Sequence, residues 1–195
     1  QMCIRDSLSI APYWYDVNDN KKTWTNKQIV QRSCGKFRRE WETSSMKEKS
    51  YTPENYPILR YGDVLLMLAE AENEAHQGPT DLAYECINEI RQRAGISKLE
   101  GLSYTDFQQA VRDERARELC FESLRKYDLV RWGIYVEAVH DKLGAATQDK
   151  RWATGNQFIG ARDYAARTQE KHQFLPIPTK ELDVNGKLEQ NKYWQ

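Results

Sequence analysis

The sequence predicts a mainly α-helical fold, built on tetratricopeptide-like αα-hairpins with short strands and long loops. Apolar residues recur every three or four positions through most of residues 60–143, which is the period of helices with one buried face. A Gly-Pro pair at positions 78–79 separates the first two of these stretches. Charged residues make up 30% of the chain and apolar residues 39%, a balance that suits solvated helices around a core.

The first part of the chain, residues 8–57, lacks helical periodicity and is rich in Asn, Thr, Lys and aromatic residues. We expect short strands or extended segments at APYWYDV and GKFRREW, joined by polar turns. The six residues MCIRDS at positions 2–7 back-translate into the end of a transposon adapter used in sequencing libraries. We therefore interpret residues 1–7 as a sequencing or cloning scar. Residues 8–195 are then the C-terminal part of a domain whose N-terminal part is missing.

The first helix is expected at about residues 60–77. Glycine at position 78 should form its C-terminal cap, and Pro79 cannot continue the helix. The apolar stripe predicted for this helix consists of Val64, Leu65, Leu68, Ala69 and Ala75.

The second helix should begin at Thr80 or Asp81, since both are good N-caps, and end before Gly95. Two amphipathic helices joined by a tight turn form an αα-hairpin, which is the unit of tetratricopeptide-like repeats. One hairpin does not by itself establish a repeat array. The apolar stripe of the second helix consists of Ala83, Ile87, Ile90 and Ala94.

The third helix is expected to begin at Thr105, with Gln108 completing a capping box. Phe107, Val111 and Phe121 should point inward, while outward charges pair as Asp113 with Arg117 and Arg115 with Glu118. A fourth helix is predicted from about Leu124 to Leu143. The composition from Gly144 to Lys171 predicts a long loop, and FLPIPTKELD an extended segment that leads into a short helical turn.

The totals exclude several classes of partner. Lys plus Arg and Asp plus Glu are both 29, so the zero net charge gives no electrostatic reason to expect nucleic acid. The four cysteines form no C-x-x-C pair and no zinc-ligand pattern, and no phosphate-binding glycine motif is present. We expect no metal and no cofactor. No apolar run approaches the ~20 residues that a membrane-spanning helix needs.

A catalytic site is not expected either. Glu114 and Glu118 share a helix face, but a dimetal bundle would also need Glu-x-x-His motifs, and Glu72 and His76 are spaced one residue too far apart. Nearby arginines are the more ordinary partners of these glutamates. Two Ser-x-x-Lys matches lack the companion motifs of penicillin-binding enzymes. The sequence therefore predicts a protein that is not an enzyme.

Aromatic residues carry the remaining functional signal, because flat rings can stack on the apolar faces of sugars. Alternation along a strand would place Trp14 and Tyr15 on opposite faces, one of which should be core. Trp152 falls in a predicted loop, where packing alone explains a large ring less well. Packing against the helices is the favoured interpretation of the strand aromatics. The candidate ligand-binding residues are Trp14, Tyr15 and Trp152.

Six short blocks, taken in order, resemble the C-terminal part of RagB/SusD-type nutrient-binding lipoproteins. The first two are NYPILR with DVLLMLAEA at positions 55–71, and INEIRQRAG at 87–95. ERARELCFE at 114–122 and RKYDLVRW at 125–132 follow, with LPIP at 175–178 and Gln190-Asn191 near the end. Any one block would be weak, but the ordered series covers well over half of the chain.

The resemblance implies a SusD-like helical fold on the outer face of the outer membrane. Such proteins are anchored by an N-terminal lipidated cysteine, cap a SusC-like TonB-dependent transporter and capture glycans or other nutrients. That cysteine is absent here, since Cys3 lies in the expected scar. The resemblance also implies that charged residues join the helices rather than bind ligand. This ion-pair scaffold consists of Arg60, Glu70, Arg91, Arg93, Glu114, Glu118, Arg125, Asp128 and Arg131.

Two other functions stay open at the level of sequence. A tetratricopeptide-like protein–protein adaptor predicts further helical hairpins and a concave groove. A glycan-processing enzyme predicts two carboxylates about 5–10 Å apart in a cleft.

Overall fold

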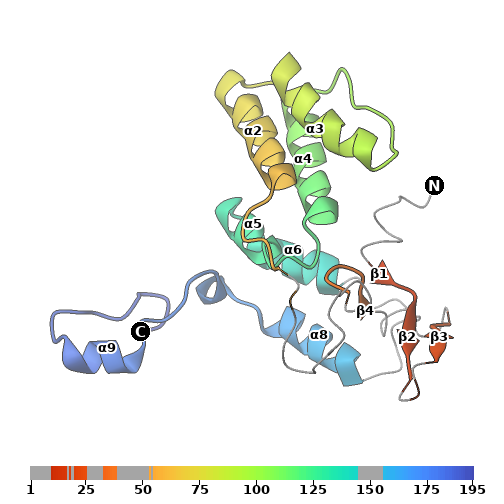
Figure 1. The fold of residues 1–195 in the computed structure, drawn as a ribbon. Coiled ribbons are helices and arrows are strands. Elements are labelled where there is room, and N and C mark those ends of the chain that lie inside the picture. Colours follow the sequence, from red (N-terminus) through yellow and green to blue (C-terminus); the bar gives the residue numbers. More distant parts are fainter. Residues whose placement is uncertain are drawn as a thin grey trace. The chain divides into compact units, whose positions relative to one another are not determined.

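The computed structural model describes residues 10–16, 18, 20–25, 33–38, 53, 55–144 and 156–195 (Figure 1). The expected scar at residues 1–7 and the candidate Trp152 lie outside these residues. The chain divides into two compact units, which we call the first unit (residues 1–24 and 31–125) and the second unit (residues 25–30 and 126–195). Most described residues are helical, so the predicted fold class is confirmed.

Short strands open the first unit. β1 (Ile10–Ala11) pairs antiparallel with β4 (Ser33–Cys34), and β2 (Tyr13–Tyr15) pairs antiparallel with β3 (Lys21–Thr23). The turn between β2 and β3 is closed by Asp16, whose carboxylate accepts the backbone N–H groups of Asn18 at 2.9 Å and Asn20 at 3.0 Å. The expected extended segment GKFRREW is not formed at its start, because Phe37 has a left-handed φ of 56°.

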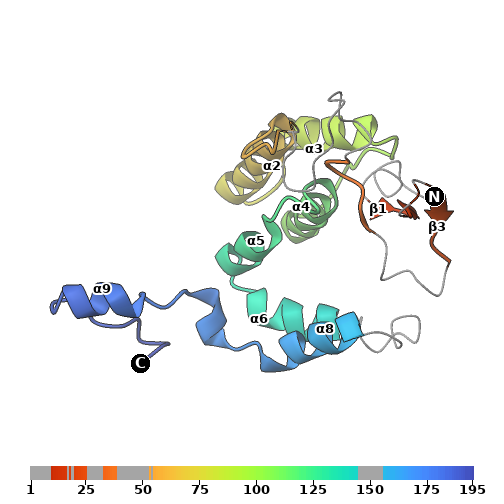
Figure 2. The same cartoon turned by 60° about the horizontal axis from the view of Figure 1, so that its bottom comes forward.

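The predicted helical hairpin follows. α2 (Tyr61–His76) and α3 (Asp81–Arg93) lie side by side in both views (Figures 1 and 2). Thr80 caps α3 as expected, accepting the backbone N–H of Ala83 at 3.1 Å. The left-handed residue after α2 is Gln77, with φ 52°, and not Gly78. The backbone N–H of Gly78 instead donates to the carbonyl of Asn73 at 3.1 Å, so the C-terminal cap is made one residue early.

The buried face of α2 is rotated from the predicted stripe. Leu65 and Ala69 are buried as expected, but Leu66 joins them, whereas Val64 and Leu68 are 40% and 37% exposed. The reason is that α2 is apolar on two faces, so periodicity alone could not choose the one facing the core.

α4 (Tyr104–Glu118) packs against α2 and completes the core of the first unit (Figure 2). Its N-cap is Ser103, not Thr105, because the Ser103 hydroxyl accepts the backbone N–H of Asp106 at 3.2 Å. Phe107 and Val111 are buried as predicted. Phe121 is 49% exposed, since the helix has already ended. The core consists of Leu65, Leu66, Ala69, Ala83, Cys86, Ile87, Ile90, Phe107 and Val111.

The single fourth helix predicted for residues 124–143 is broken into three pieces. They are α5 (Arg125–Arg131), α6 (Tyr135–Ala138) and the π-helical turn η3 (Val139–Leu143). Gly133 makes the break, because its φ of 70° is a left-handed conformation that glycine adopts without strain.

The predicted long loop at residues 144–171 contains a helix, α8 (Asn156–Arg167), which packs on η3. Leu129, Tyr135, Val139 and Ala165 form the small core of the second unit. η5 (Glu170–Gln173) and α9 (Thr179–Val184) follow (Figure 2). Within the described part of the chain, none of the helices combines the length and the apolar character needed to cross a bilayer.

Candidate functional site

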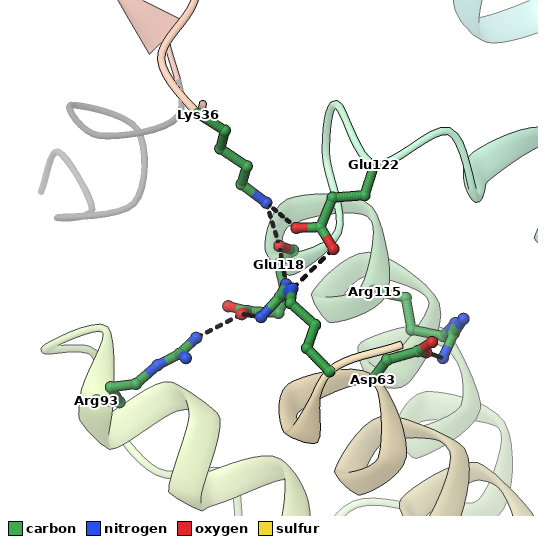
Figure 3. Close-up of polar contacts among 7 residues, drawn as sticks. Lys36, Asp63, Arg93, Arg115, Glu118 and Glu122 are labelled. Atoms are coloured by element: carbon green, nitrogen blue, oxygen red, sulfur yellow. Dashed lines mark hydrogen bonds and ion pairs between the residues drawn. The ribbon is translucent and has the colours of Figure 1, made fainter. Parts of the chain in front are cut away.

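A cluster of charged side chains ties the segment before α2 to the end of α4 (Figure 3). Arg60 stands at its centre: its Nη1 lies 2.9 Å from Glu118 Oε1 and its Nε lies 2.7 Å from Glu122 Oε2. Arg93 of α3 adds a second guanidinium on Glu118, and the Lys36 ammonium pairs with Glu122. Lys36 Nζ also donates to the backbone carbonyl of Glu118 at 2.7 Å. Four separate stretches of the first unit therefore meet at two carboxylates.

The two carboxylates of this cluster need their cationic partners because they are buried. Glu118 and Glu122 are only 4% and 6% exposed, and a buried carboxylate is costly unless cations and hydrogen bonds compensate it. Burial raises the pKa of Glu118, but the hydrogen bonds from Arg93 and Arg60 outweigh it, so the pKa falls below its ordinary value. Burial likewise lowers the pKa of Arg60, and its bonds to Glu122 and Glu118 reverse this and raise it. Both pKa shifts favour the charged forms of Glu118 and Arg60.

The Glu114/Glu118 pair, the one carboxylate pair that the sequence offered for chemistry, is engaged by arginines. Arg91 Nη1 lies 3.1 Å from Glu114 Oε2, and Glu114 is fully buried. Glu118 is held by Arg60 and Arg93. Carboxylates that donate or abstract protons in glycoside hydrolysis face a cleft that admits the sugar. Here both glutamates instead form ion pairs with arginines from other parts of the first unit.

Other residues assigned to the scaffold lie in α2 and α5. Asp128 accepts from Arg131 Nε at 3.1 Å within α5, and Arg125 Nη1 donates to the carbonyl of Arg112 at 3.3 Å. Glu70 is half-buried on α2. Of the residues assigned to the scaffold, Arg60, Arg91, Arg93, Glu114 and Glu118 form ion pairs between segments that are distant in the chain.

Sequence reasoning missed three members of the charged network. Lys36 and Glu122 close the cluster, and Asp63 pairs with Arg115 at 2.8 Å with both side chains buried. Asp63 and Glu122 lie inside the blocks of residues 55–71 and 114–122. Only their place in these family blocks could have singled out Asp63 and Glu122 in the sequence. Helix spacing could not, because their partners are 52 or more residues away in the chain.

The candidate ligand residues Trp14 and Tyr15 lie in the β2–β3 hairpin. They are 39% and 44% exposed, so neither face of β2 is the core face that alternation predicted. The Trp14 ring stacks on Trp24 with centroids 5.4 Å apart and an interplanar angle of 29°. Tyr13 is fixed at its hydroxyl by Arg38 Nη1 at 2.6 Å. The hairpin thus presents supported but accessible rings, a surface that suits stacking on a flat ligand face.

A second aromatic surface lies in the second unit, around a cavity of about 420 Å³. Trp194 is oriented there by its indole N–H, which donates to the carbonyls of Phe174 at 3.0 Å and Lys171 at 3.1 Å. Burial, and then the hydrogen bond between the Tyr135 and Tyr164 hydroxyls, raises the pKa of Tyr135 to about 12. The volume falls within the range of small-molecule sites. Sequence reasoning missed this cavity, because its lining residues come from distant segments.

The LPIP block contributes Leu175 and Pro176 to the lining of this cavity and is hydrogen-bonded to the Gln-Asn block. The side-chain amide of Gln190 accepts the backbone N–H of Ile177 at 2.9 Å and donates to the Ile177 carbonyl at 3.0 Å. The side chain of Gln190 thus satisfies both the N–H and the carbonyl of Ile177, as the backbone of a neighbouring strand would. In the parts of the chain that the structure describes, no cluster of three or more metal-ligating side chains occurs.

Comparison with known proteins identifies the fold. The SusD_RagB model, which describes the SusD family, matches residues 4–194. The chain belongs to the SusD family. A SusD-like protein P25 of Formosa agariphila is 40% identical over 139 residues, 69% of this chain and 23% of that protein. A SusD-like protein P2 of the same organism is 29% identical over 148 residues, 70% of this chain and 25% of that protein.

Two solved SusD proteins and a solved surface glycan-binding protein have folds similar to this chain. A SusD homolog from Bacteroides thetaiotaomicron has a TM-score of 0.81 and 32% identity, covering 96% of this chain and 40% of its own. A SusD superfamily protein from Bacteroides vulgatus has a TM-score of 0.64 and 26% identity, and the match covers 97% of this chain and 39% of that protein. The surface glycan-binding protein A from Bacteroides uniformis has a TM-score of 0.59 and 26% identity, and the match covers 94% of this chain and 37% of that protein.

The predicted family and the SusD-like fold are both confirmed. The chain spans about a quarter of the length of the curated relatives that it matches.

Proposed function

We propose that this chain is part of a cell-surface, outer-membrane subunit that binds a nutrient, and specifically a glycan, for uptake. The observation that carries the proposal is the match of the SusD family model to residues 4–194. A Bacteroides uniformis protein of the same fold is named for surface glycan binding, which favours glycans among possible nutrients. The partner would be a SusC-like TonB-dependent transporter, and the membrane contact an N-terminal lipid anchor.

The ligand contact proposed within this chain is the β2–β3 hairpin. Trp14 and Tyr15 are exposed, and Trp14 is backed by Trp24, so its ring is supported on one face. A pyranose ring stacks through its C–H face on such a ring and loses little freedom in doing so. We extend the proposal to Trp152, which lies outside the described residues, as an aromatic side chain of the same chemical kind.

The charged cluster supports a scaffold role for its members rather than a ligand role. Arg60 and Glu118 already bind one another, and a ligand would have to break buried ion pairs to reach them. The same pairing disfavours a glycan-processing enzyme built on Glu114 and Glu118. The adaptor alternative has no comparable support, since the family match extends well beyond the helical hairpin.

The glycan proposal is tested by native electrophoresis of the 195-residue chain through gels containing amylopectin, xylan, laminarin or galactomannan. Retardation by at least one polysaccharide is expected, and Trp14→Ala should abolish it while leaving the circular dichroism unchanged. Tyr127→Ala removes a ring that is 69% exposed elsewhere and serves as the matched control. Loss of retardation in Phe174→Ala but not in Trp14→Ala would indicate that the ligand binds at the second-unit cavity instead.

The partner proposal is tested separately on the full-length gene product. A lipoprotein signal should precede the SusD region, and a TonB-dependent transporter should co-purify from detergent-solubilised outer membranes. If the full-length protein binds none of the polysaccharides and retains no transporter, the proposed function is wrong.

A further inference from the structure

The cavity of the second unit has an apolar wall that is open to solvent. Phe174 forms part of this wall, and its ring stacks on Tyr193 with centroids 4.8 Å apart and an interplanar angle of 8°. Phe174 is nevertheless 42% exposed, and Leu175 beside it is 80% exposed. The wall therefore contains a flat ring that is packed on one face and accessible from solvent, within a volume of about 420 Å³.

Trp194 gives the cavity a second ring of fixed orientation. Its indole N–H already donates to the carbonyls of Phe174 and Lys171, so the indole offers a ligand its apolar surface rather than its donor. The imidazole of His172 packs edge-on against the indole, with centroids 5.8 Å apart and an interplanar angle of 80°. These contacts hold the ring in place, so a ligand that packs on it costs little side-chain freedom.

The charged side chains on the cavity carry a net positive charge. Lys126 and Arg167 line it, against the single carboxylate of Asp163, and His172 adds a further charge when it is protonated. Asp163 and Arg167 are four residues apart on α8, yet no ion pair joins these two described side chains. The guanidinium of Arg167 can therefore accept a ligand carboxylate through two parallel hydrogen bonds.

A pair of tyrosine hydroxyls supplies a neutral donor on the same cavity. The hydroxyls of Tyr135 and Tyr164 are hydrogen-bonded to each other. One member of such a pair donates and the other accepts, so one O–H proton remains for a further acceptor. Tyr135 is 2% exposed and Tyr164 50% exposed, so Tyr164 is the member that a ligand reaches.

The balance of these groups indicates the chemistry of a ligand. A saccharide carries hydroxyls around its whole ring, and each costs free energy if it is buried against carbon without a partner. A flat apolar ring with one carboxylate matches both the aromatic wall and the cations. We propose that the second-unit cavity binds a small aromatic carboxylate, with its ring against Phe174 and Trp194 and its carboxylate on Arg167. This site is separate from the β2–β3 hairpin and does not depend on the glycan-binding function proposed for it.

The test uses ferulate, a single aromatic ring that carries one carboxylate through a short side chain, and the full-length gene product. Ligand-observed NMR titration should give a Kd of about 1 mM or lower, as expected for a ligand of this size. Arg167→Gln should raise the Kd at least about tenfold, because it removes a charge-assisted hydrogen bond. Arg162→Gln is the matched control, since Arg162 is an exposed arginine of α8 outside the cavity lining and should not alter the Kd.

Two further ligands separate the ring from the charge. Methyl ferulate keeps the ring but lacks the negative charge, and should bind at least about tenfold more weakly than ferulate. Glucuronate keeps the carboxylate on a sugar ring, and should bind no more tightly than methyl ferulate. Tighter binding of glucuronate than of ferulate would overturn the proposal, because the site would then be one for acidic sugars. Equal binding of ferulate and its ester would overturn the role given to Arg167.

The remaining comparisons separate this site from the rest of the protein. Trp14→Ala should leave ferulate binding unchanged although it should abolish retardation by polysaccharide, so the two proposals can fail independently. Binding of ferulate by the 195-residue chain but not by the full-length protein would overturn the present one, because another part of the SusD fold would then fill the cavity. Absence of binding to both proteins, or an unchanged Kd in a folded Arg167→Gln variant, would also show that it is wrong.

Discussion

The guanidinium of Arg115 lies 2.8 Å from the carboxylate of Asp63, and the side chains are only 5% and 8% exposed. Arg115 comes from the last turn of α4 and Asp63 from the first turn of α2. The pair therefore joins two helices of the first unit at a point that water hardly reaches. Such a pair costs much to desolvate and contributes most when both members are present.

Replacing Asp63 by alanine should destabilise the first unit strongly. The change removes the carboxylate from beside a buried guanidinium, and breaking a buried pair in this way costs about 3–5 kcal/mol. Urea unfolding monitored by circular dichroism measures the loss. Asp113→Ala is the control, because its pair with Arg117 is 3.9 Å long and about half exposed, and exposed pairs contribute about 0–1 kcal/mol. Similar losses in the two variants would refute the role given to the buried pair.

Gly62→Ala should destabilise the protein, although alanine is the better helix former. A Cβ at this position would lie 3.2 Å from Arg60 Nη1 and 3.3 Å from Glu118 Oε1, so it would press on the charged cluster. Overpacking of this kind costs about 1–3 kcal/mol. Gly160→Ala is the matched change within α8, where no neighbouring atom lies within 4 Å, and should stabilise by about 0.5–1 kcal/mol. Opposite shifts in the unfolding midpoints are the expected result; a stabilising Gly62→Ala would contradict it.

Acid should weaken the charged cluster through Glu118. The folded pKa of this carboxyl lies below its ordinary value of 4.5, so its contribution to stability is present above that pH and is lost as pH falls through the folded pKa. The free energy of unfolding should therefore decline below about pH 4.5, and Glu118→Gln should make this decline shallower. Urea unfolding at a series of pH values tests this. An unchanged acid slope in Glu118→Gln would count against the argument.

The hydroxyl of Tyr135 should ionise at a higher pH than that of a tyrosine in water. Its pKa is raised to about 12 from an ordinary 10, so the unfolded chain loses this proton first. The stability that the group contributes is present below pH 10 and is lost between pH 10 and about 12. Titration of tyrosinate absorbance should show a late component that Tyr135→Phe removes and Tyr127→Phe leaves in place. A late component that survives in Tyr135→Phe would contradict the assignment.

Local patterns predicted the hairpin well, because its determinants lie within a few residues of one another. Thr80 caps α3 through a hydroxyl three residues from its partner, and the stripe of α3 is buried as expected. The break at Gly133 was missed, since the surrounding residues keep a helical composition and only the backbone φ ends the helix. α8 was missed because the Gly, Gln, Thr and Ala of residues 144–171 as a whole indicated a loop, although the helix itself contains three alanines and two arginines.

The candidate site was less predictable from sequence. The arginines and glutamates could be named, but their partners depend on which helices pack together. Arg60 binds Glu118 and Glu122 from 58 and 62 residues away. The exposure of Trp14 and Tyr15 is likewise a tertiary property, because alternation along a strand does not say whether either face is covered.

The sequence alone determined the family, the helical class and the hairpin, because ordered motifs, helical periodicity and caps are written in neighbouring residues. The tertiary structure decided which face of α2 is core, which carboxylate each arginine holds and where the aromatic rings are accessible. These depend on contacts between segments that are distant in the chain, and the energy of burying a charge or an apolar face is set by what lies opposite. For that reason Leu66 is buried and Leu68 exposed, although both are leucines on the same helix.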